Sequence, residues 1–337
     1  MREVVVSERD AGQRLDKYLQ KILAKAPKGF LYKMLRKKNI TLNGKKAAGG
    51  EKLQPGDAIR LFLSEETLEK FSPDAQAAQK RQKSLRPEVI YEDDQALLLN
   101  KPAGMLSQKS AARDYSLTEW LRDYLDGEGF GQNSPGFSPG VCNRLDRNTS
   151  GIVAAGKSVR AQQQLAELFK NRSLGKYYLC PVQGALKEPG RLKGYLKKSE
   201  KDNKAILCGE KEAGAAYIET AYRPLGDNGR LTLLEVELCT GKTHQIRAHL
   251  AGLGHPLVGD AKYGGAQWAR VCERQWGIRC QLLHAWRLET PACDGALKAL
   301  SCQAFYAELS GPFWDFLQKE HLEEFMPWKK KSERTRL

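Results

Sequence analysis

Near its middle, the 337-residue chain reads Asn143-Arg144-Leu145-Asp146-Arg147-Asn148-Thr149-Ser150-Gly151. The stretch places one acid, Asp146, between two arginines and ends in a polar turn. The apolar run from Ile152 to Ala155 follows and predicts a short buried strand. A carboxylate at such a loop-strand junction can face a cleft, where the flanking cations would keep it ionised at neutral pH. The pattern predicts that Asp146 is a nucleophile, with a structural salt bridge as the alternative.

These nine residues resemble the H-R-L-D-x-x-T-S-G signature of the RluA-type pseudouridine synthases, with Asn143 in place of the histidine. Enzymes of this family convert chosen uridines of RNA to pseudouridine without a cofactor. The resemblance therefore implies that Asp146 is the nucleophile and that neither a cofactor nor a metal is needed. The bond from ribose C1′ to uracil N1 is broken and remade to C5. The aspartate either adds to uracil C6 or acts at C1′, and the sequence leaves both routes open.

Two later motifs extend the resemblance to the remaining catalytic groups. Lys176-Tyr177-Tyr178-Leu179 fits the family pattern K-x-Y, which implies that Tyr178 stacks on a flipped base and takes part in proton transfer. The segment from Thr240 to His249 fits T-G-R-T-H-Q-I-R-x-H, with Lys242 in place of the first arginine. This match implies that Arg247 is the partner of the catalytic aspartate. A guanidinium suits that role because it can bind a carboxylate through two parallel hydrogen bonds.

Other matches concern contacts to the base and to RNA. Arg144 occupies the position that, in some family members, enters the space left by a flipped uridine. Leu282-Leu283-His284-Ala285 matches the late L-H-A element of the family, which implies that Leu283 provides an apolar wall for the base. We interpret His244 and His249 as structural or RNA-facing, because their spacing is not that of a zinc-binding pair. Two further matches are interpreted as framework, namely Lys101-Pro102-Ala103-Gly104 and Pro256-Leu257-Val258-Gly259-Asp260.

The composition favours a polyanionic partner. The formal net charge is +15, and 41% hydrophobic and 28% charged residues are ordinary for a globular protein. Nucleic acid is favoured over a membrane, since no basic amphipathic helix stands out and no apolar run approaches the ~18 residues of a membrane span. Because the N-terminus has no apolar signal core, we expect a cytoplasmic protein, and we expect a monomer. Its eight cysteines lack C-x-x-C spacing, which predicts reduced thiols and no metal site.

Residues 1–65 predict a small α/β domain. Apolar positions at helical spacing within 15–23 and 31–35 predict two helices, Asn43-Gly44 predicts a hairpin turn, and alternation from Ile59 to Leu63 predicts a strand. Residues 1–64 carry fifteen Lys and Arg against six Asp and Glu, a net charge of +9 that suggests phosphate contact. With Arg14-Leu15-Asp16-Lys17 at the first helix, this order resembles the S4 RNA-binding domain that many RluA-type enzymes carry. The candidate RNA contacts on the second helix are Lys33, Arg36, Lys37 and Lys38.

The remainder is expected to form a polar linker at 66–87, a catalytic domain at 88–320 and a basic tail at 321–337. Apolar periodicity predicts strands at 89–91, 96–100, 152–155, 177–182 and 231–238, and helices at 117–124, 159–170 and 243–250. Their irregular alternation predicts an α+β fold with a mixed, mostly antiparallel sheet flanked by helices. The segments 147–151 and Val182-Gln183-Gly184 are similar to the RluC branch of the family. That similarity implies large-subunit ribosomal RNA as the substrate and partner.

Two alternative functions remain to be weighed. The segment from Gly151 to Ser158 also satisfies the expression G-x-x-x-x-G-K-[ST] of P-loop nucleotidases. A phosphate cradle requires a supple loop after a strand, whereas Ile152 to Ala155 is itself an apolar strand. The second alternative is a non-catalytic RNA-binding factor that relies on the S4-like domain alone. The combination of Asp146, Tyr178 and Arg247 favours an enzyme over both alternatives.

Overall fold

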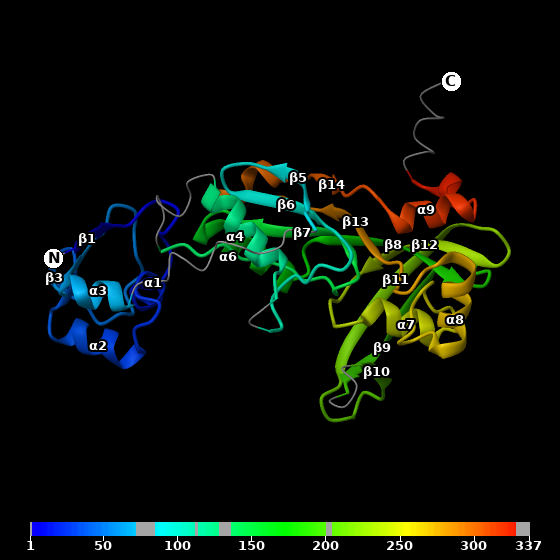
Figure 1. Ribbon diagram of the computed structural model, residues 1–337, viewed down its shortest axis with the longest axis horizontal. Helices are drawn as coiled ribbons and strands as arrows, with labels where there is room; N and C mark the ends of the chain where they lie inside the picture. The colour runs from blue at the N-terminus through cyan, green and yellow to red at the C-terminus, as the bar shows by residue number, and fades with distance from the viewer. Residues whose placement is uncertain (1, 72–84, 112–113, 128–135, 200–203, 328–337) are drawn as a thin grey trace, which may run out of the picture.

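The computed structural model describes residues 2–71, 85–111, 114–127, 136–199 and 204–327, which fold into two units (Figure 1). The smaller, N-terminal unit contains a four-stranded antiparallel sheet in the order β1-β4-β2-β3. Asn43 and Gly44 both have positive φ, at 50° and 73°, as a tight two-residue hairpin turn requires. The elements of this unit are β1 (Arg2–Val5), α1 (Leu15–Ile22), α2 (Lys28–Arg36), β2 (Ile40–Leu42), β3 (Lys45–Lys46), β4 (Ala58–Leu61) and α3 (Glu65–Phe71).

Helix α3 lies in the stretch that the sequence analysis assigned to the linker. Leu68 is buried in the N-terminal core, and the ring of Phe71 lies 4.8 Å from that of Phe30. The helix therefore belongs to the N-terminal unit. The expected linker residues 72–84 lie outside the described residues.

The larger unit is built on a ten-stranded sheet in the order β10-β9-β11-β12-β8-β13-β7-β6-β5, with β14 paired to β13. Within the described residues its pairings are antiparallel, except for a short parallel contact between β13 and β7. This arrangement confirms the predicted α+β class with a mixed, mostly antiparallel sheet. The strands are β5 (Glu88–Glu92), β6 (Ala96–Lys101), β7 (Ser150–Gly156), β8 (Gly175–Gln183), β9 (Gly190–Lys198), β10 (Ala205–Cys208), β11 (Ala216–Asp227), β12 (Leu231–Leu238), β13 (His284–Glu289) and β14 (Ala304–Tyr306).

Helices pack on both faces of this sheet because the strands alternate in the direction of their apolar side chains. In β7, Val153 and Ala155 contribute to one core, and Ile152 and Ala154 to the core on the opposite face. Helices α4 and α7 cover the first face, α6 and η1 cover the second, and α8 and α9 pack against β8 and β12. Their bounds are α4 (Leu117–Gly127), α6 (Val159–Lys170), α7 (Gln245–Gly252), α8 (Gly265–Trp276), η1 (Gly295–Leu300), α9 (Pro312–Lys319) and η2 (Glu323–Phe325).

The parallel contact between β7 and β13 joins the two halves of the large sheet. Gly151 has φ +110°, and a Cβ atom at this position would lie 2.2 Å from the carbonyl oxygen of Ala285. Only glycine permits that backbone approach. Across the same junction, the Ser150 hydroxyl and Nδ1 of His284 lie 2.8 Å apart. The stretch from Asn143 to Gly151 thus ends where the two halves of the large sheet meet, between β7 and β13.

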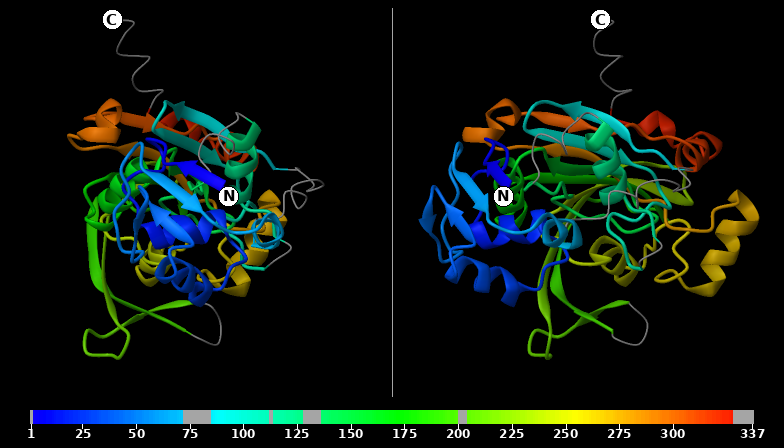
Figure 2. Two further views of the ribbon diagram at one scale, coloured as in Figure 1. Left: turned by 90° about the vertical axis from the view of Figure 1, so that its left-hand side faces the viewer. Right: turned by 60° about the vertical axis from the view of Figure 1, so that its left-hand side comes forward.

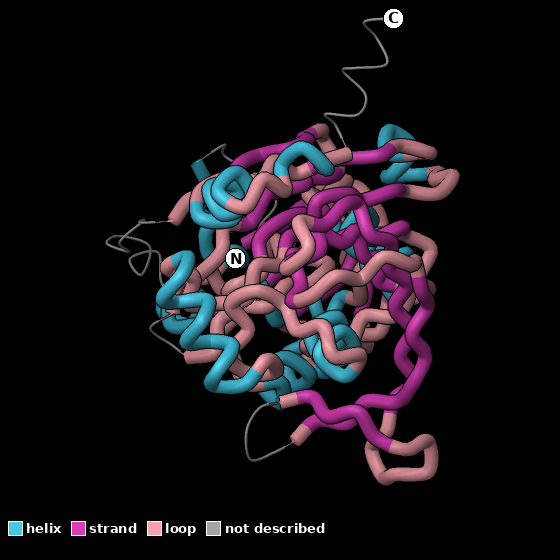
Figure 3. Tube along the Cα trace, turned by 90° about the vertical axis from the view of Figure 1, so that its right-hand side faces the viewer, coloured by secondary structure: helices cyan, strands magenta, loops and turns pink. Residues whose placement is uncertain are grey.

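Strands β9, β10 and β11 extend away from the body of the molecule as an arm (Figures 2 and 3). These strands and helices α8 and α9 were not predicted from the sequence. At the other end of the chain, Leu322 and Met326 are fully buried beside α9, so the basic tail does not begin at residue 321 as expected. Residues 328–337 lie outside the described residues.

Candidate active site

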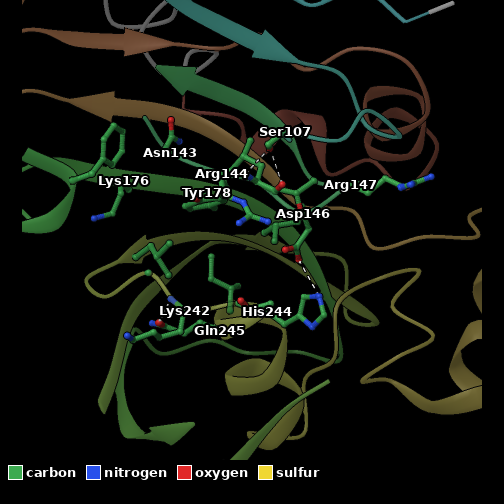
Figure 4. Close-up of a pocket in the computed structure, with 18 of the residues that line it drawn as sticks. Ser107, Asn143, Arg144, Asp146, Arg147, Lys176, Tyr178, Lys242, His244 and Gln245 are labelled. Atoms are coloured by element: carbon green, nitrogen blue, oxygen red, sulfur yellow. Dashed lines mark hydrogen bonds and ion pairs between the residues drawn. The ribbon is translucent and has the colours of Figure 1, made fainter. Parts of the chain in front are cut away.

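A cavity of about 1020 Å³ opens beside the loop that precedes β7 (Figure 4). One side is formed by the loop residues 142–147 together with β8, and the other by residues 241–247 at the start of α7. Asp146, Tyr178, Arg247, Arg144 and Leu283 all line it. The structure therefore brings together the predicted catalytic residues and the two predicted base contacts, which lie up to 139 positions apart in the sequence.

Two buried side chains fix the loop that carries Asp146. The Ser107 hydroxyl accepts a hydrogen bond from the Leu145 backbone amide at 3.0 Å and lies 2.9 Å from the carbonyl oxygen of the same residue. The fully buried Lys101 ammonium donates to the carbonyl oxygens of Pro102, Met105 and Arg147. Burial lowers the pKa of Lys101 to about 7, against the opposing effect of the Asp146 carboxylate.

Ser107→Ala is expected to loosen this loop and to destabilise the fold by about 1–3 kcal/mol, because it leaves the buried Leu145 amide without its side-chain acceptor. The measurements are the melting temperature and hydrogen–deuterium exchange of residues 143–149. Ser110→Ala is the matched control, since its hydroxyl bonds Asp114 on the exposed part of the same segment. Equal exchange rates in the two variants would contradict this role of Ser107.

Asn143, which departs from the family signature, lies in the lining of the cavity, and its side chain bonds to β7 (Figure 4). Its side-chain amide donates to the Ile152 carbonyl oxygen at 3.2 Å, and its side-chain oxygen accepts from the Ala154 amide at 2.8 Å. The Asn143 side chain thus donates one hydrogen bond to β7 and accepts another from it, as the peptide groups of a neighbouring strand would. Its position explains why a change from histidine leaves the catalytic groups in place.

The Asp146 carboxylate is partly exposed in the cavity, with 27% of its side chain accessible. Its Oδ2 atom lies 3.3 Å from Nη1 of Arg247 and 3.7 Å from Nε2 of His244. Of the two arginines that flank Asp146 in the sequence, Arg147 points away from the carboxylate in Figure 4, and the ion pairs found for Asp146 among the described residues are with Arg247 and His244. A role of Arg144 beside the acid stays a prediction.

Arg247 is fixed by a second carboxylate that the sequence analysis had interpreted as framework. Its Nε and Nη2 atoms donate to the two oxygens of Asp260 at 2.7 and 2.8 Å, while Nη1 reaches Asp146. Both Arg247 and Asp260 are buried. Burial alone would lower the pKa of Arg247, but the paired carboxylates outweigh it and raise the pKa. Asp260 therefore aims a permanent cation at Asp146.

Tyr178 and Leu283 form apolar walls of the cavity. Both are buried, and Tyr178 lies on β8 opposite Ala285 of β13. Burial raises the pKa of the Tyr178 phenol, and the neighbouring Asp146 carboxylate raises it further. The hydroxyl is therefore neutral at physiological pH and can act as a proton donor.

The candidate RNA contacts of the N-terminal unit lie elsewhere. Lys33, Arg36, Lys37 and Lys38 are exposed on and just after α2 and do not line the cavity. The N-terminal unit contacts the catalytic unit through the Val159 amide, which donates to the Arg9 carbonyl oxygen at 3.0 Å. The predicted RNA contacts thus fall into two groups in the structure, one in the cavity lining and one on the surface of the N-terminal unit.

The segment that fits the P-loop expression forms a strand and a helix start. Its residues 151–156 belong to β7, Nζ of Lys157 lies 2.6 Å from Glu92, and the Ser158 hydroxyl caps α6 by accepting from the Ala161 amide. Backbone amides engaged in a strand cannot form a phosphate cradle. The nucleotidase alternative is therefore not supported.

Within the described parts of the chain, no group of three His, Cys, Asp or Glu side chains is arranged to hold a metal ion. The same residues include no helix long and apolar enough to cross a membrane.

Comparisons with known proteins agree on one family. Residues 95–252 match the family model described as RNA pseudouridylate synthase. The chain is 30% identical over 284 residues to ribosomal large subunit pseudouridine synthase C of Vibrio vulnificus, covering 84% of this chain and 86% of the relative. It is 29% identical over 320 residues to the protein of that name from Escherichia coli strain K12, covering 88% and 95%.

Among solved structures, human RNA pseudouridylate synthase domain containing 4 superimposes with a TM-score of 0.55 at 22% identity, covering 69% of this chain and 92% of that chain. This likeness supports the fold, and the sequence relatives establish the family. The chain belongs to the RNA pseudouridylate synthase family.

Proposed function

We propose that this RNA pseudouridine synthase modifies uridines of large-subunit ribosomal RNA and uses Asp146 as its nucleophile. The similarity to ribosomal large subunit pseudouridine synthases C supports the choice of RNA. The observation that carries the assignment of the nucleophile is the position of the Asp146 carboxylate, which lies in the cavity and is held from one side by Arg247. We further propose that the enzyme works in the cytoplasm as a monomer.

The reaction is an isomerisation, so the site must hold one base, supply a nucleophile and move one proton. Asp146 attacks the flipped uridine at C6 or at C1′, and either route uses the carboxylate that Arg247 contacts at 3.3 Å. Leu283 and the ring of Tyr178 enclose the base, and the neutral Tyr178 hydroxyl is available for proton transfer. Arg144, which also lines the cavity, would enter the space that the flipped uridine leaves in the RNA.

The lining of the cavity suits a polyanion larger than one nucleoside. Its volume of about 1020 Å³ is at the upper end of the range for pockets that hold whole drug-sized ligands. Asp146 is the one acidic side chain among the described lining residues. Guanidinium and ammonium groups around a site of this size favour phosphate contacts to the nucleotides that flank the target. The lining cations are Lys109, Arg144, Arg147, Lys170, Arg172, Lys176, Lys198, Lys242 and Arg247.

We propose that the N-terminal unit is an S4-like RNA-binding domain. Support comes from its net charge of +9 over residues 1–64 and from four exposed cations on and just after α2. These positions are remote from the cavity lining, so their contacts would add affinity without touching the reacting base.

The double variant Lys33→Gln/Arg36→Gln is expected to bind ribosomal RNA more weakly and with a flatter salt dependence. Each lost phosphate contact lowers the slope of log K against log[salt] by about 0.7–0.9. Filter binding at several salt concentrations measures the slope. Arg270→Gln/Arg274→Gln on α8 is the control, because it removes the same charge from exposed positions outside the cavity. An unchanged slope in the α2 variant would exclude this helix from the RNA interface.

The test of the function is to incubate the protein with transcribed ribosomal RNA and to map pseudouridine by chemical probing. We expect modified positions in large-subunit RNA and none in a matched small-subunit transcript. RNA binding without any pseudouridine on either transcript would favour the non-catalytic alternative. Modification confined to the small-subunit transcript would contradict the proposed substrate.

A further inference from the structure

His244 lines the same cavity as the catalytic aspartate, and in Figure 4 its ring points toward the Asp146 carboxylate. Its Nε2 atom lies 3.7 Å from Oδ2, the same carboxylate oxygen that Arg247 contacts at 3.3 Å. Both of these contacts of Asp146 thus go to one of its two oxygens: the Arg247 contact is a hydrogen bond, and the His244 contact is longer than one.

The hydrogen-bond network around Tyr263 favours one tautomer of His244. The Tyr263 oxygen accepts a hydrogen bond from the Ala205 amide at 2.8 Å and lies 3.0 Å from Nδ1 of His244. Its hydroxyl proton has Nδ1 as a partner when Nδ1 is unprotonated. In that assignment the neutral imidazole carries its proton on Nε2, the nitrogen nearer to Asp146. The opposite tautomer would aim a lone pair at a carboxylate.

The charged groups around His244 support the neutral ring. Burial lowers the pKa of the imidazole, and the Arg247 and Lys262 cations lower it further, against the opposing effects of Asp146 and Asp260. On the far side of the network, Lys204 lies over the Tyr263 ring at 5.0 Å. A neutral His244 is able to donate through Nε2 while Nδ1 remains an acceptor.

The backbone of His244 is held in a conformation that costs energy. Its φ of +56° places it in the left-handed region at the residue that precedes α7. Histidine is tolerated there, but asparagine is better suited. A strained backbone conformation at a residue next to the nucleophile suggests that the His244 side chain has a function at this position.

We propose that His244 is a positioning residue for the nucleophile: its Nε2–H group, 3.7 Å from Oδ2 of Asp146 in the free protein, closes to a hydrogen bond on that oxygen when RNA binds, beside the Arg247 contact, which leaves Oδ1 as the attacking oxygen. Tyr263 supports this arrangement by occupying Nδ1. The inference rests on the proposed role of Asp146. No proton leaves His244 in this step; the imidazole orients the carboxylate. In the complex with RNA, the two donors restrict rotation about the terminal bond of Asp146.

Three variants separate this role from a purely structural one. His244→Asn suits the left-handed backbone but is too short to reach Asp146, so we expect an unchanged melting temperature and a kcat about 10–100-fold lower with little change in KM. His244→Gln keeps an N–H donor at a similar reach and should recover most of the lost rate. Tyr263→Phe removes only the hydroxyl and should lower kcat by less than His244→Asn does. Tyr195→Phe, whose hydroxyl bonds Glu210 on the arm, is the matched control.

The tautomer can be read directly in the free protein. Long-range ¹H–¹⁵N spectra of histidine-labelled protein distinguish Nε2–H from Nδ1–H, and the signals of His244 are those missing from His244→Asn. We expect Nε2–H in the wild type and a mixture of tautomers in Tyr263→Phe. An Nδ1–H tautomer in the wild type, or a His244→Asn variant with kcat within about twofold of wild type, overturns this inference. A wild type that makes no pseudouridine overturns the proposed function instead, and the spectrum still reports on His244.

Discussion

Asp146→Asn is expected to reduce single-turnover pseudouridine formation by at least about 10⁴-fold, because an amide cannot supply the nucleophilic oxygen. RNA affinity should stay within about twofold of wild type, since binding rests on phosphate contacts spread over many cations. The rate is measured with enzyme in excess over a ribosomal RNA transcript, and the affinity by filter binding at fixed salt. The neutral side chain fits the same space, so the melting temperature reports whether the fold is intact.

The matched control for this experiment is Asp315→Asn, which makes the same change at an exposed position on α9. It should leave both rate and affinity unaltered. Pseudouridine formation by Asp146→Asn near the wild-type rate would remove Asp146 from the mechanism and return it to the salt-bridge alternative. A parallel loss of RNA affinity would instead assign Asp146 to binding.

Arg247→Lys is expected to lower kcat by about 10²–10³-fold and to lower the melting temperature as well. Lysine keeps the charge but has one ammonium group, whereas Arg247 binds both oxygens of Asp260 and reaches Asp146 at the same time. The buried Asp260 would lose one of the two hydrogen bonds that it accepts from Arg247, and a buried carboxylate with a broken ion pair destabilises a fold by a few kcal/mol. Rate and melting temperature are measured on the same preparation.

Arg274→Lys on the exposed side of α8 is the control for loss of a guanidinium, and it should change neither quantity. The rate measured well below the melting temperature separates the two effects of Arg247→Lys, because loss of the contact to Asp146 lowers kcat even while the fold is intact. A variant that loses stability but keeps the wild-type rate would limit Arg247 to a structural role.

The sequence predicts the elements whose signals are local. The apolar periodicity of 159–170 and 231–238 gives the bounds of α6 and β12 as the structure has them. Strand β9 escaped prediction because it carries few apolar side chains among its lysines, arginine and glycines, so the alternation that marks a half-buried strand is weak. Helix α3 lies in a stretch predicted as a flexible or partly helical linker, and its packing through Leu68 into the N-terminal core could not be predicted because that is a tertiary effect.

In the candidate site, too, some features could be predicted from local sequence and others could not. Motif matches identify Asp146, Tyr178 and Arg247, but the contacts between them depend on the fold. Asp260 binds Arg247 from a turn 13 positions away, and a carboxylate in an apolar motif gives no sign of its partner. The charge of Arg147 shows the same limit, because this neighbour of Asp146 in the sequence points away from the carboxylate in the fold.

The junction between β7 and β13 also determines when the enzyme becomes active during its synthesis. The Ser150 amide donates to the Leu283 carbonyl oxygen, and Arg247 lies 101 positions after Asp146. A nascent chain that has left the ribosome only to residue 240 already contains Asp146 and β7. It still lacks β13, which pairs with β7, and Arg247, which contacts Asp146. Contacts this distant in sequence form late in folding. We therefore expect that RNA modification begins only when the last third of the chain has been translated, so partial products cannot act on RNA.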